Sequence, residues 1–157
     1  MDALTDLPAT MAGVWLTGHG GPEVLEYRTD IPVPRPGPGE VLVKVAAAGV
    51  NNTDINTRVG WYAREVKAPT DAAAAQATEA GGWAGAMQFP RIQGGDLCGH
   101  VVARGEGVGR LALGARVVSP NCLPRPRPDN PLNFIVIGSE IDGAFAEYCL
   151  MREDDLY

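Results

Sequence analysis

The stretch VLVKVAAAGVNNTD, residues 41–54, decides the fold of this chain of 157 residues. Its first part, residues 41–48, is the strongest strand signal in the sequence, because it is a continuous apolar run that contains several β-branched side chains. Two amides, a hydroxyl and a carboxyl then end the run, which is typical of a junction between a strand and a helix. We expect Asn52 or Thr53 to cap a short helix that continues through Arg58 and ends at Gly60.

Short strands and glycine turns continue on both sides of this stretch. The chain contains 20 Gly and 13 Pro, a balance that favours turns over long helices. Such a sequence predicts a mainly β fold with short helices, of the α+β class, arranged as a barrel or a sandwich. Further strands are expected at residues 13–16, 24–28, 97–103, 115–118 and 143–151.

Two proline-rich segments interrupt the strands. Residues 31–39 lack the N–H donors that a central strand needs, so they are expected to form an extended connector. Residues 122–131 are expected to be irregular. Between these segments, residues 71–80 are rich in alanine and predict a helix that Asp71 caps.

The length of the chain fits one domain with a sizeable core. Residues 1–12 lack the basic and apolar regions of a signal peptide, so we expect them to form an N-terminal extension. The domain is therefore placed at residues 13–157. Within it, the Ala-rich residues 63–89 are interpreted as an insertion.

Composition argues against several classes of partner. The formal net charge is −6, so no basic surface suits a nucleic acid, and no apolar run approaches the length that spans a membrane. The three cysteines, Cys98, Cys122 and Cys149, are odd in number and far apart. This pattern predicts buried, reduced thiols in a cytoplasmic protein rather than a disulfide framework or a structural zinc site.

Three motifs of common enzymes are incomplete. The glycine cluster at residues 105–109 has Arg110 where a dinucleotide-binding loop needs its last glycine, and a strand is expected after it in place of a helix. We therefore expect a hairpin turn there and no nucleotide-binding domain within this chain. His19 and His100 have no metal-ligand or triad partners in the sequence, and both are interpreted as structural.

The polar cluster that follows the strongest strand leaves two interpretations open. In the first, Asn51, Thr53 and Asp54 only cap the helix, and the residues alone favour this interpretation. In the second, the end of the strand faces a cleft in which an amide and a carboxylate orient a ligand. Tyr62 would then add a hydroxyl to the same cleft.

The ordered set of motifs resembles the N-terminal, GroES-like catalytic domain of the medium-chain dehydrogenase/reductase superfamily. The resemblance covers nearly all of residues 11–157 and implies a partly open β-barrel. Within the superfamily the chain is most similar to the zeta-crystallin-like quinone oxidoreductases. After the proline-rich connector, the motifs are GPGEVLVKV (37–45), GVN (49–51), RVGWY (58–62), GGDLCGHVV (94–102), GEGV (105–108), GARVV (114–118) and DGAFAEY (142–148).

The resemblance also implies a site without zinc. Zinc dehydrogenases of the superfamily have a Cys ligand in the place of Asn51 and a His ligand in the place of Gly95, and they carry a four-Cys lobe where this chain has only Cys122. In the quinone oxidoreductases, the equivalents of Asn51 and Tyr62 lie beside the nicotinamide. We therefore expect Asn51 and Tyr62 to bind cofactor and substrate, Asp54 to orient the local network, and no metal to be held.

The implied activity is that of an oxidoreductase that uses NADPH to reduce a small molecule, a quinone, an enone or another activated carbonyl. The Rossmann domain of the superfamily is not encoded in these residues. We therefore expect one part of a longer or split protein, with a Rossmann domain supplied elsewhere, that is inactive alone. Two alternatives remain open: a non-catalytic β-barrel module that binds a partner chain, and a zinc-type alcohol dehydrogenase-like protein that has lost its metal.

Overall fold

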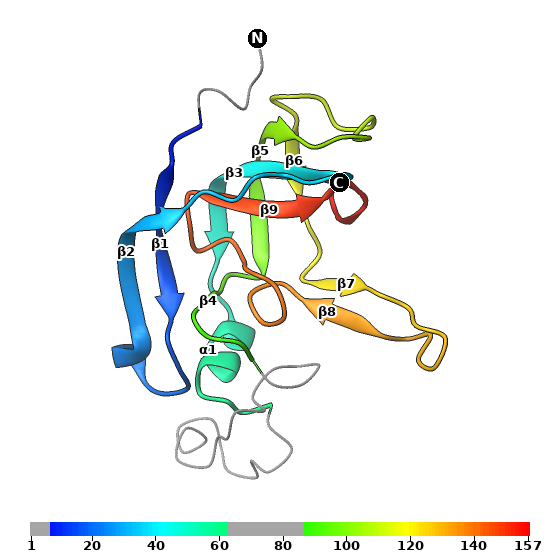
Figure 1. Ribbon diagram of the computed structural model, residues 1–157. Coiled ribbons are helices and arrows are strands. Elements are labelled where there is room, and N and C mark those ends of the chain that lie inside the picture. Colours follow the sequence, from blue (N-terminus) through cyan, green and yellow to red (C-terminus); the bar gives the residue numbers. More distant parts are fainter. Residues whose placement is uncertain (1–6, 63–86) are drawn as a thin grey trace.

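The computed structural model describes residues 7–62 and 87–157, and Figure 1 shows them as a mainly β fold with a short α-helix at one end. The mainly β class expected from the sequence is thereby confirmed. The helix expected at residues 71–80, like most of the proposed insertion, lies outside the described residues. In the described part of the chain, no helix is long and apolar enough to cross a membrane.

The first sheet has the strand order β2-β1-β4. Its central strand β1 (Thr10–Leu16) pairs antiparallel with β2 (Leu25–Pro32) and with β4 (Arg91–Ile92). A 3-10 turn, η1 (Pro22–Val24), precedes β2. β1 begins earlier than the expected residue 13, because its first two residues pair with the last two of β2. β2 in turn extends to a proline, which an edge strand tolerates.

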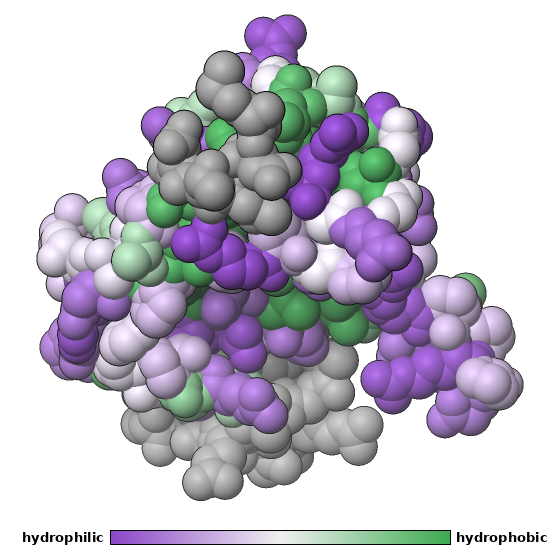
Figure 2. Space-filling view, turned by 45° about the horizontal axis from the view of Figure 1, so that its top comes forward, coloured by the Kyte–Doolittle hydropathy of each residue, from purple (hydrophilic) through white to green (hydrophobic). Residues whose placement is uncertain are grey.

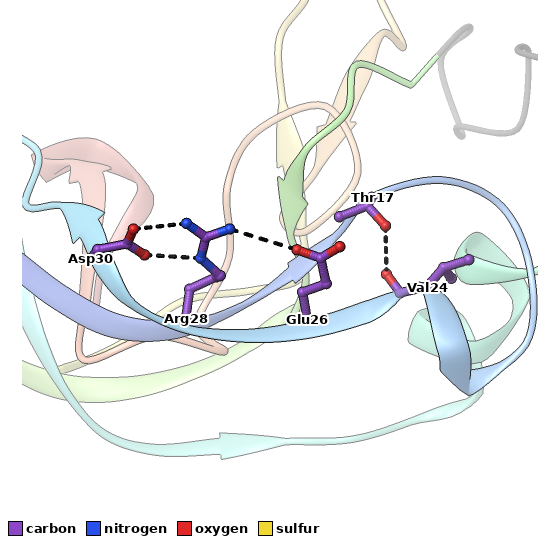
Figure 3. A network of polar contacts seen from close by, with 5 residues as sticks. All are labelled: Thr17, Val24, Glu26, Arg28 and Asp30. Carbon is purple, nitrogen blue, oxygen red and sulfur yellow. Dashed lines mark hydrogen bonds and ion pairs between the residues drawn. The ribbon is translucent and has the colours of Figure 1, made fainter.

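Charged side chains lie along the edge strand β2, as Figure 3 shows. The Arg28 guanidinium donates two hydrogen bonds to Asp30, at 2.9 and 2.7 Å, and lies 3.7 Å from a carboxylate oxygen of Glu26. Just before β2 begins, the Thr17 hydroxyl donates to the Val24 carbonyl at 3.1 Å and closes the turn between β1 and β2. Charges along an edge strand oppose its pairing with a strand of another chain, so this edge is protected from aggregation.

The second sheet has the strand order β6-β5-β3-β9 and supports the candidate site. The strands expected at residues 41–48, 97–103 and 115–118 are confirmed in it. The last strand is shorter than expected, because residues 143–145 donate their backbone hydrogen bonds to residues 92–94 instead of continuing the sheet. The strands are β3 (Glu40–Gly49), β5 (Asp96–Arg104), β6 (Arg116–Val118) and β9 (Tyr148–Arg152), followed by a 3-10 turn, η2 (Glu153–Asp155).

Strand β3 contributes to a hydrophobic core on each of its faces. Val41 and Val43 pack in one cluster with side chains of β5, β6 and β9, while Leu42 packs in a second cluster with Met11 and Ile31 of the first sheet. All three β3 side chains are fully buried. Burial on both faces explains the continuous apolar run at the start of this strand. The end of β3 is thus fixed by packing, and so is the start of the segment that follows it.

Residues 122–131 are more ordered than expected. β7 (Cys122–Pro124) pairs antiparallel with β8 (Phe134–Val136), and the hairpin projects from the domain as an arm. Leu123 is fully buried and anchors the base of the arm, whereas the projecting part at the right of Figure 2 is mainly hydrophilic. The prediction of an irregular segment is wrong for residues 122–124, because both strands of a two-stranded sheet are edges, where proline is tolerated; residues 125–131 belong to no named strand.

The three cysteines differ in exposure. Cys149 on β9 is buried, Cys98 on β5 is half-buried, and Cys122 at the start of β7 is exposed. The expectation of buried thiols is therefore confirmed for Cys149 and wrong for Cys122. Burial, and after it the nearby Asp142 carboxylate, raises the pKa of the Cys149 thiol to about 12, so this thiol is protonated at neutral pH.

Candidate functional site

A short helix, α1 (Asn52–Arg58), begins where β3 ends and carries two of the predicted site residues at its first turn. Asn51 is the N-cap: its side-chain oxygen accepts a hydrogen bond from the Thr53 N–H at 2.8 Å. The Asp54 carboxylate accepts from the Asn51 N–H at 3.0 Å, which completes a capping box. The cap is therefore one residue earlier than Asn52, the first of the two expected positions. The predicted end at Gly60 is confirmed by its positive φ of 71°.

Asn51 also joins the two segments that the sequence set apart as informative. The register of β3 and β5 places Gly49 opposite Asp96. The side-chain amide of Asn51 then donates to the Asp96 carboxylate at 3.0 Å. Because the cap uses the oxygen and Asp96 accepts from the amide, both ends of the Asn51 side chain have defined roles, and its orientation is fixed.

Asp54 is buried between α1 and the residues that precede β5. Its second carboxylate oxygen accepts from the Gly94 N–H at 3.1 Å, and its backbone carbonyl accepts from the Gln93 side chain at 2.8 Å. Burial raises the pKa of Asp54, and the Asp96 charge raises it further, against the lowering effect of hydrogen bonds from Asn51 and Gly94. Asp54 therefore clamps the two segments together.

Gly94 allows the close approach of a third segment. Its φ is +101°, and a Cβ at this position would lie 2.7 Å from the Phe145 ring and 2.8 Å from the Phe145 nitrogen. A residue with a side chain is disfavoured by this backbone conformation and by the lack of space. The glycine thus lets residues 143–145 pack directly behind the site.

Tyr62 lies at the opposite end of α1 from Asn51. Its hydroxyl is 3.4 Å from the Asn56 side-chain amide, and its ring packs edge-on against Trp61 with the centroids 5.4 Å apart. The helix has seven residues, so its two ends are separated by about 10 Å along the axis. The structure therefore brings Asn51 and Asp54 together with Asp96, while Tyr62 belongs to the far end of the helix.

A hollow of about 290 Å³ opens beside Asp96, between β3, β5 and the end of β6. Gly49, Asp96, Cys98 and Ser119 are among the residues that line it. Asp96 is exposed. The Asn51–Asp96 pair thus stands at an accessible surface, where a carboxylate and an oriented amide can contact a small molecule.

The residues at this site do not fit the catalytic zinc of the superfamily. In the part of the chain that the structure describes, no three His, Cys, Asp or Glu side chains converge to hold a metal. The position at which the resemblance places the second ligand is also filled: a Cβ on Gly95 would lie 2.0 Å from the side-chain nitrogen of Asn121 and 2.7 Å from its Cγ. The Asn121 carboxamide therefore occupies the space that a zinc-binding side chain at residue 95 would need.

Of the two histidines, His19 has the structural role that the sequence suggested. Nδ1 of His19 lies 3.1 and 3.2 Å from the carbonyl oxygens of Thr57 and Arg58, at the end of α1. The Arg58 guanidinium donates to the Gly20 carbonyl at 2.7 Å, which fastens the same glycine turn to the helix. His100 is exposed on β5. Neither residue contacts the Asn51–Asp96 pair.

The glycine cluster at residues 105–109 precedes a row of backbone N–H groups that binds a carboxylate of the chain itself. The N–H groups of Gly109, Arg110 and Leu111 donate to Glu153 at 3.3, 2.6 and 2.7 Å. Hydrogen bonds from these groups lower the pKa of Glu153. The loop thus binds an anion, but the anion is an internal anchor, in keeping with the expectation that it is no phosphate loop.

Sequence reasoning missed three residues of the site. Gln93 and Asn121 were not singled out, and Asp96 was noted only as part of a motif. The antiparallel pairing of β3 with β5 could have suggested Asp96, since β5 begins with Asp96 opposite the end of β3, where the polar segment starts. No local signal marks Asn121, because its place beside Gly95 depends on the path of the chain after β6.

The comparisons with known proteins agree with this fold and these motifs. A family profile described as the alcohol dehydrogenase GroES-like domain matches residues 37–157. The quinone oxidoreductase of Lama guanicoe is 29% identical over 147 residues, which are 94% of this chain and 33% of that protein. The chain thus spans about a third of the length of this curated relative.

Two solved structures are similar over almost the whole chain. A Sinorhizobium meliloti 1021 protein, provisionally assigned as an alcohol dehydrogenase, has a TM-score of 0.80 at 39% identity and covers 99% of this chain with 41% of its own. A provisionally assigned zinc-binding dehydrogenase of the same organism, solved with NADP, has a TM-score of 0.72 at 26% identity over 96% and 38% of the two chains. The chain therefore belongs to the alcohol dehydrogenase GroES-like domain family of the medium-chain dehydrogenase/reductase superfamily, on its quinone oxidoreductase-like branch.

Proposed function

We propose that this chain is the catalytic-domain part of an NADPH-dependent oxidoreductase that reduces a quinone, an enone or another activated carbonyl without zinc. The observation that carries the proposal is the packing of Asn121 against Gly95. Asn51, which stands where the resemblance places the first zinc ligand, supports it. The curated quinone oxidoreductases support the substrate class, and the relative solved with NADP supports the cofactor.

In the proposed reaction, NADPH supplies a hydride to the acceptor carbon. Without a Lewis acid, the carbonyl oxygen must be stabilised by hydrogen bonds, which are effective when the donors are already oriented. Asn51 is oriented by the α1 cap and by Asp96, so it can contact the nicotinamide edge with a fixed geometry. Asp54 holds the segment that carries Asn51, and Tyr62 contributes from the far end of α1.

The dinucleotide-binding part of the enzyme would come from a Rossmann domain outside these residues, in the same chain or in a partner. This follows from the length of the curated relative, of which the chain spans a third. We further propose a cytoplasmic location, which the three free cysteines support because unpaired thiols persist in a reducing compartment.

The proposal is tested with the intact protein, expressed with whatever in-frame sequence follows the codon for Tyr157. NADPH oxidation should be measured with naphthoquinone and with cyclohexenone, before and after prolonged treatment with EDTA. We expect turnover with one of the two acceptors and no loss on chelation, because no three His, Cys, Asp or Glu side chains converge among residues 7–62 and 87–157. Loss of activity that added zinc restores would contradict the proposal.

A further inference from the structure

The residues that the family resemblance points to are hydrogen-bonded to one another. Asn51 uses its oxygen in the helix cap and its amide on Asp96, and Asp54 uses both carboxylate oxygens on backbone N–H groups. The Tyr62 hydroxyl accepts from Asn56 at the far end of α1. These bonds explain how the site keeps its shape. The oxygen of a bound carbonyl would need a further N–H donor, one that these bonds do not already use.

Asn121 is placed to supply that donor. It follows β6, and its carboxamide occupies the space into which a Cβ at residue 95 would project, with the nitrogen 2.0 Å from that Cβ position. The next residue, Asp96, accepts the hydrogen bond of Asn51. The carboxamide of Asn121 therefore packs against the residue next to Asp96 in the sequence, although it comes from a different part of the chain.

The side chain of Asn121 has a hydrogen-bonding group that the described protein does not use. Its Oδ1 is buried and has no hydrogen-bond partner among the residues that the structure describes. Buried polar atoms in native proteins nearly always have a partner, so an exception calls for an explanation such as a catalytic role or a bound molecule. The oxygen and nitrogen of a carboxamide exchange places by a half turn, so this group can present N–H or oxygen to a ligand.

We propose that Asn121 hydrogen-bonds the carbonyl oxygen of the substrate during hydride transfer, at the place where the zinc dehydrogenases have a metal ligand. This inference rests on the proposed function and names the group that replaces the Lewis acid. It assigns Gly95 a matching role, since only a residue without a Cβ leaves the carboxamide its place.

The chemistry is balanced without a proton from Asn121. The hydride passes from NADPH to the acceptor carbon and leaves NADP⁺, while the C=O π electrons move to the oxygen, which finally takes a proton from water. An N–H donor aimed at that oxygen binds the negative charge that develops in the transition state more strongly than the neutral ground state. The side chain acts by hydrogen bonding alone.

Two variants test the role of the carboxamide in the intact enzyme. Asn121→Leu keeps nearly the same shape and removes the donor, while Gly95→Ala keeps Asn121 and displaces its carboxamide. We expect each to lower kcat with naphthoquinone or cyclohexenone on the order of 10²-fold, the loss that removal of one such donor causes. The Kd for NADPH, measured by its fluorescence, should change less than about twofold, because the proposed partner of Asn121 is the substrate oxygen and not the cofactor.

Matched controls separate this role from a loss of folding. Asn133→Leu makes the same change on the arm, and Gly18→Ala adds a Cβ where nothing lies within 4 Å. Both should keep kcat within about twofold of the wild type. A wild-type kcat in Asn121→Leu overturns the role of Asn121 alone. A wild-type enzyme that oxidises NADPH with neither acceptor overturns the proposed function, and this inference with it.

Discussion

Asn51 shows how one side chain can serve both the fold and the site. Its oxygen caps α1 through Thr53, and its amide binds Asp96. A cap can be supplied by several small polar residues, whereas the contact with Asp96 needs a donor of this length. The two roles are therefore separable by substitution, even though a single residue carries both.

Asn51→Ser and Asn51→Ala should differ in stability but not in activity. Serine caps a helix about as well as asparagine, so Asn51→Ser should unfold within about 0.5 kcal/mol of the wild type, whereas Asn51→Ala should lose about 1 kcal/mol. Both lose the donor to Asp96 and should lose most of the NADPH-dependent turnover. Urea unfolding and steady-state kinetics measure the two effects, and full turnover in the serine variant would remove Asn51 from the site.

The pKa values of Asp54 and Asp30 should be shifted in opposite directions from the ordinary value of an aspartate. Burial, with the Asp96 charge, raises the pKa of Asp54, while the exposed Asp30 has its pKa lowered by hydrogen bonds from Arg28. With a raised folded-state pKa, the contribution of Asp54 to stability is complete below its unfolded-state pKa and is lost as the pH rises through the folded-state pKa. NMR titration of the carboxyl carbons checks this order. An Asp54 carboxyl that titrates below Asp30 would contradict it.

The sequence predicted Asn51 and Asp54 more accurately than it predicted the complete site. These residues lie within four positions of one another, so local capping rules apply to them. Asn121 is brought to Gly95 only by the path of the chain after β6, and an orientation set by tertiary packing leaves no local pattern. Tyr62 was expected in the same cleft as Asn51, but an intervening helix separates them.

At the scale of elements, α1 depends on its neighbours. A helix of seven residues is not stable by itself in water, so its position must come from contacts at its ends. Asp54 ties its first turn to Gly94, and His19 with Arg58 ties its last turn to the glycine turn after β1. Damage to either attachment should therefore loosen the helix and the segment that carries Asn51.

Gly94→Ala should destabilise the domain. The positive φ and the contact with Phe145 both oppose a Cβ there, and a residue forced into such a conformation costs about 1–3 kcal/mol. The matched control is Gly109→Ala, where nothing lies within 4 Å and no positive φ is required. Chemical unfolding of both variants gives the comparison. Equal stabilities would show that residues 143–145 move away from Gly94 without cost.

It was easier to predict that a segment forms a strand than to predict the residues at which the strand begins and ends. The apolar run of β3 and the alternation of β5 were sufficient for their assignment, because burial imposes those patterns. The prolines of β2 and β7 led to wrong predictions of where these strands lie. The energetic cost of a proline depends on whether its strand is at the edge of a sheet, and the order of the strands decides this.

At the scale of the whole molecule, the last residues fasten distant segments together. Glu153 binds the loop between β5 and β6, and Tyr157 exchanges two backbone hydrogen bonds with Val118 at 2.9 Å. Asp155 is buried and binds the Arg125 guanidinium of the arm through two hydrogen bonds. The arm is therefore held at its base by the end of the chain as well as by the buried Leu123.

Loss of the Arg125–Asp155 pair should matter much more than loss of the Arg28–Asp30 pair, although both are bidentate. Arg125→Met leaves the buried Asp155 carboxylate without its cation and should reduce the free energy of unfolding by about 2 kcal/mol. Arg28→Met breaks a pair whose groups are solvated and should change stability little. Asp155→Leu in the Arg125→Met background should recover part of the loss, because the unpaired charge is then absent. Equal unfolding midpoints for the two arginine variants would show that the arm does not depend on the end of the chain.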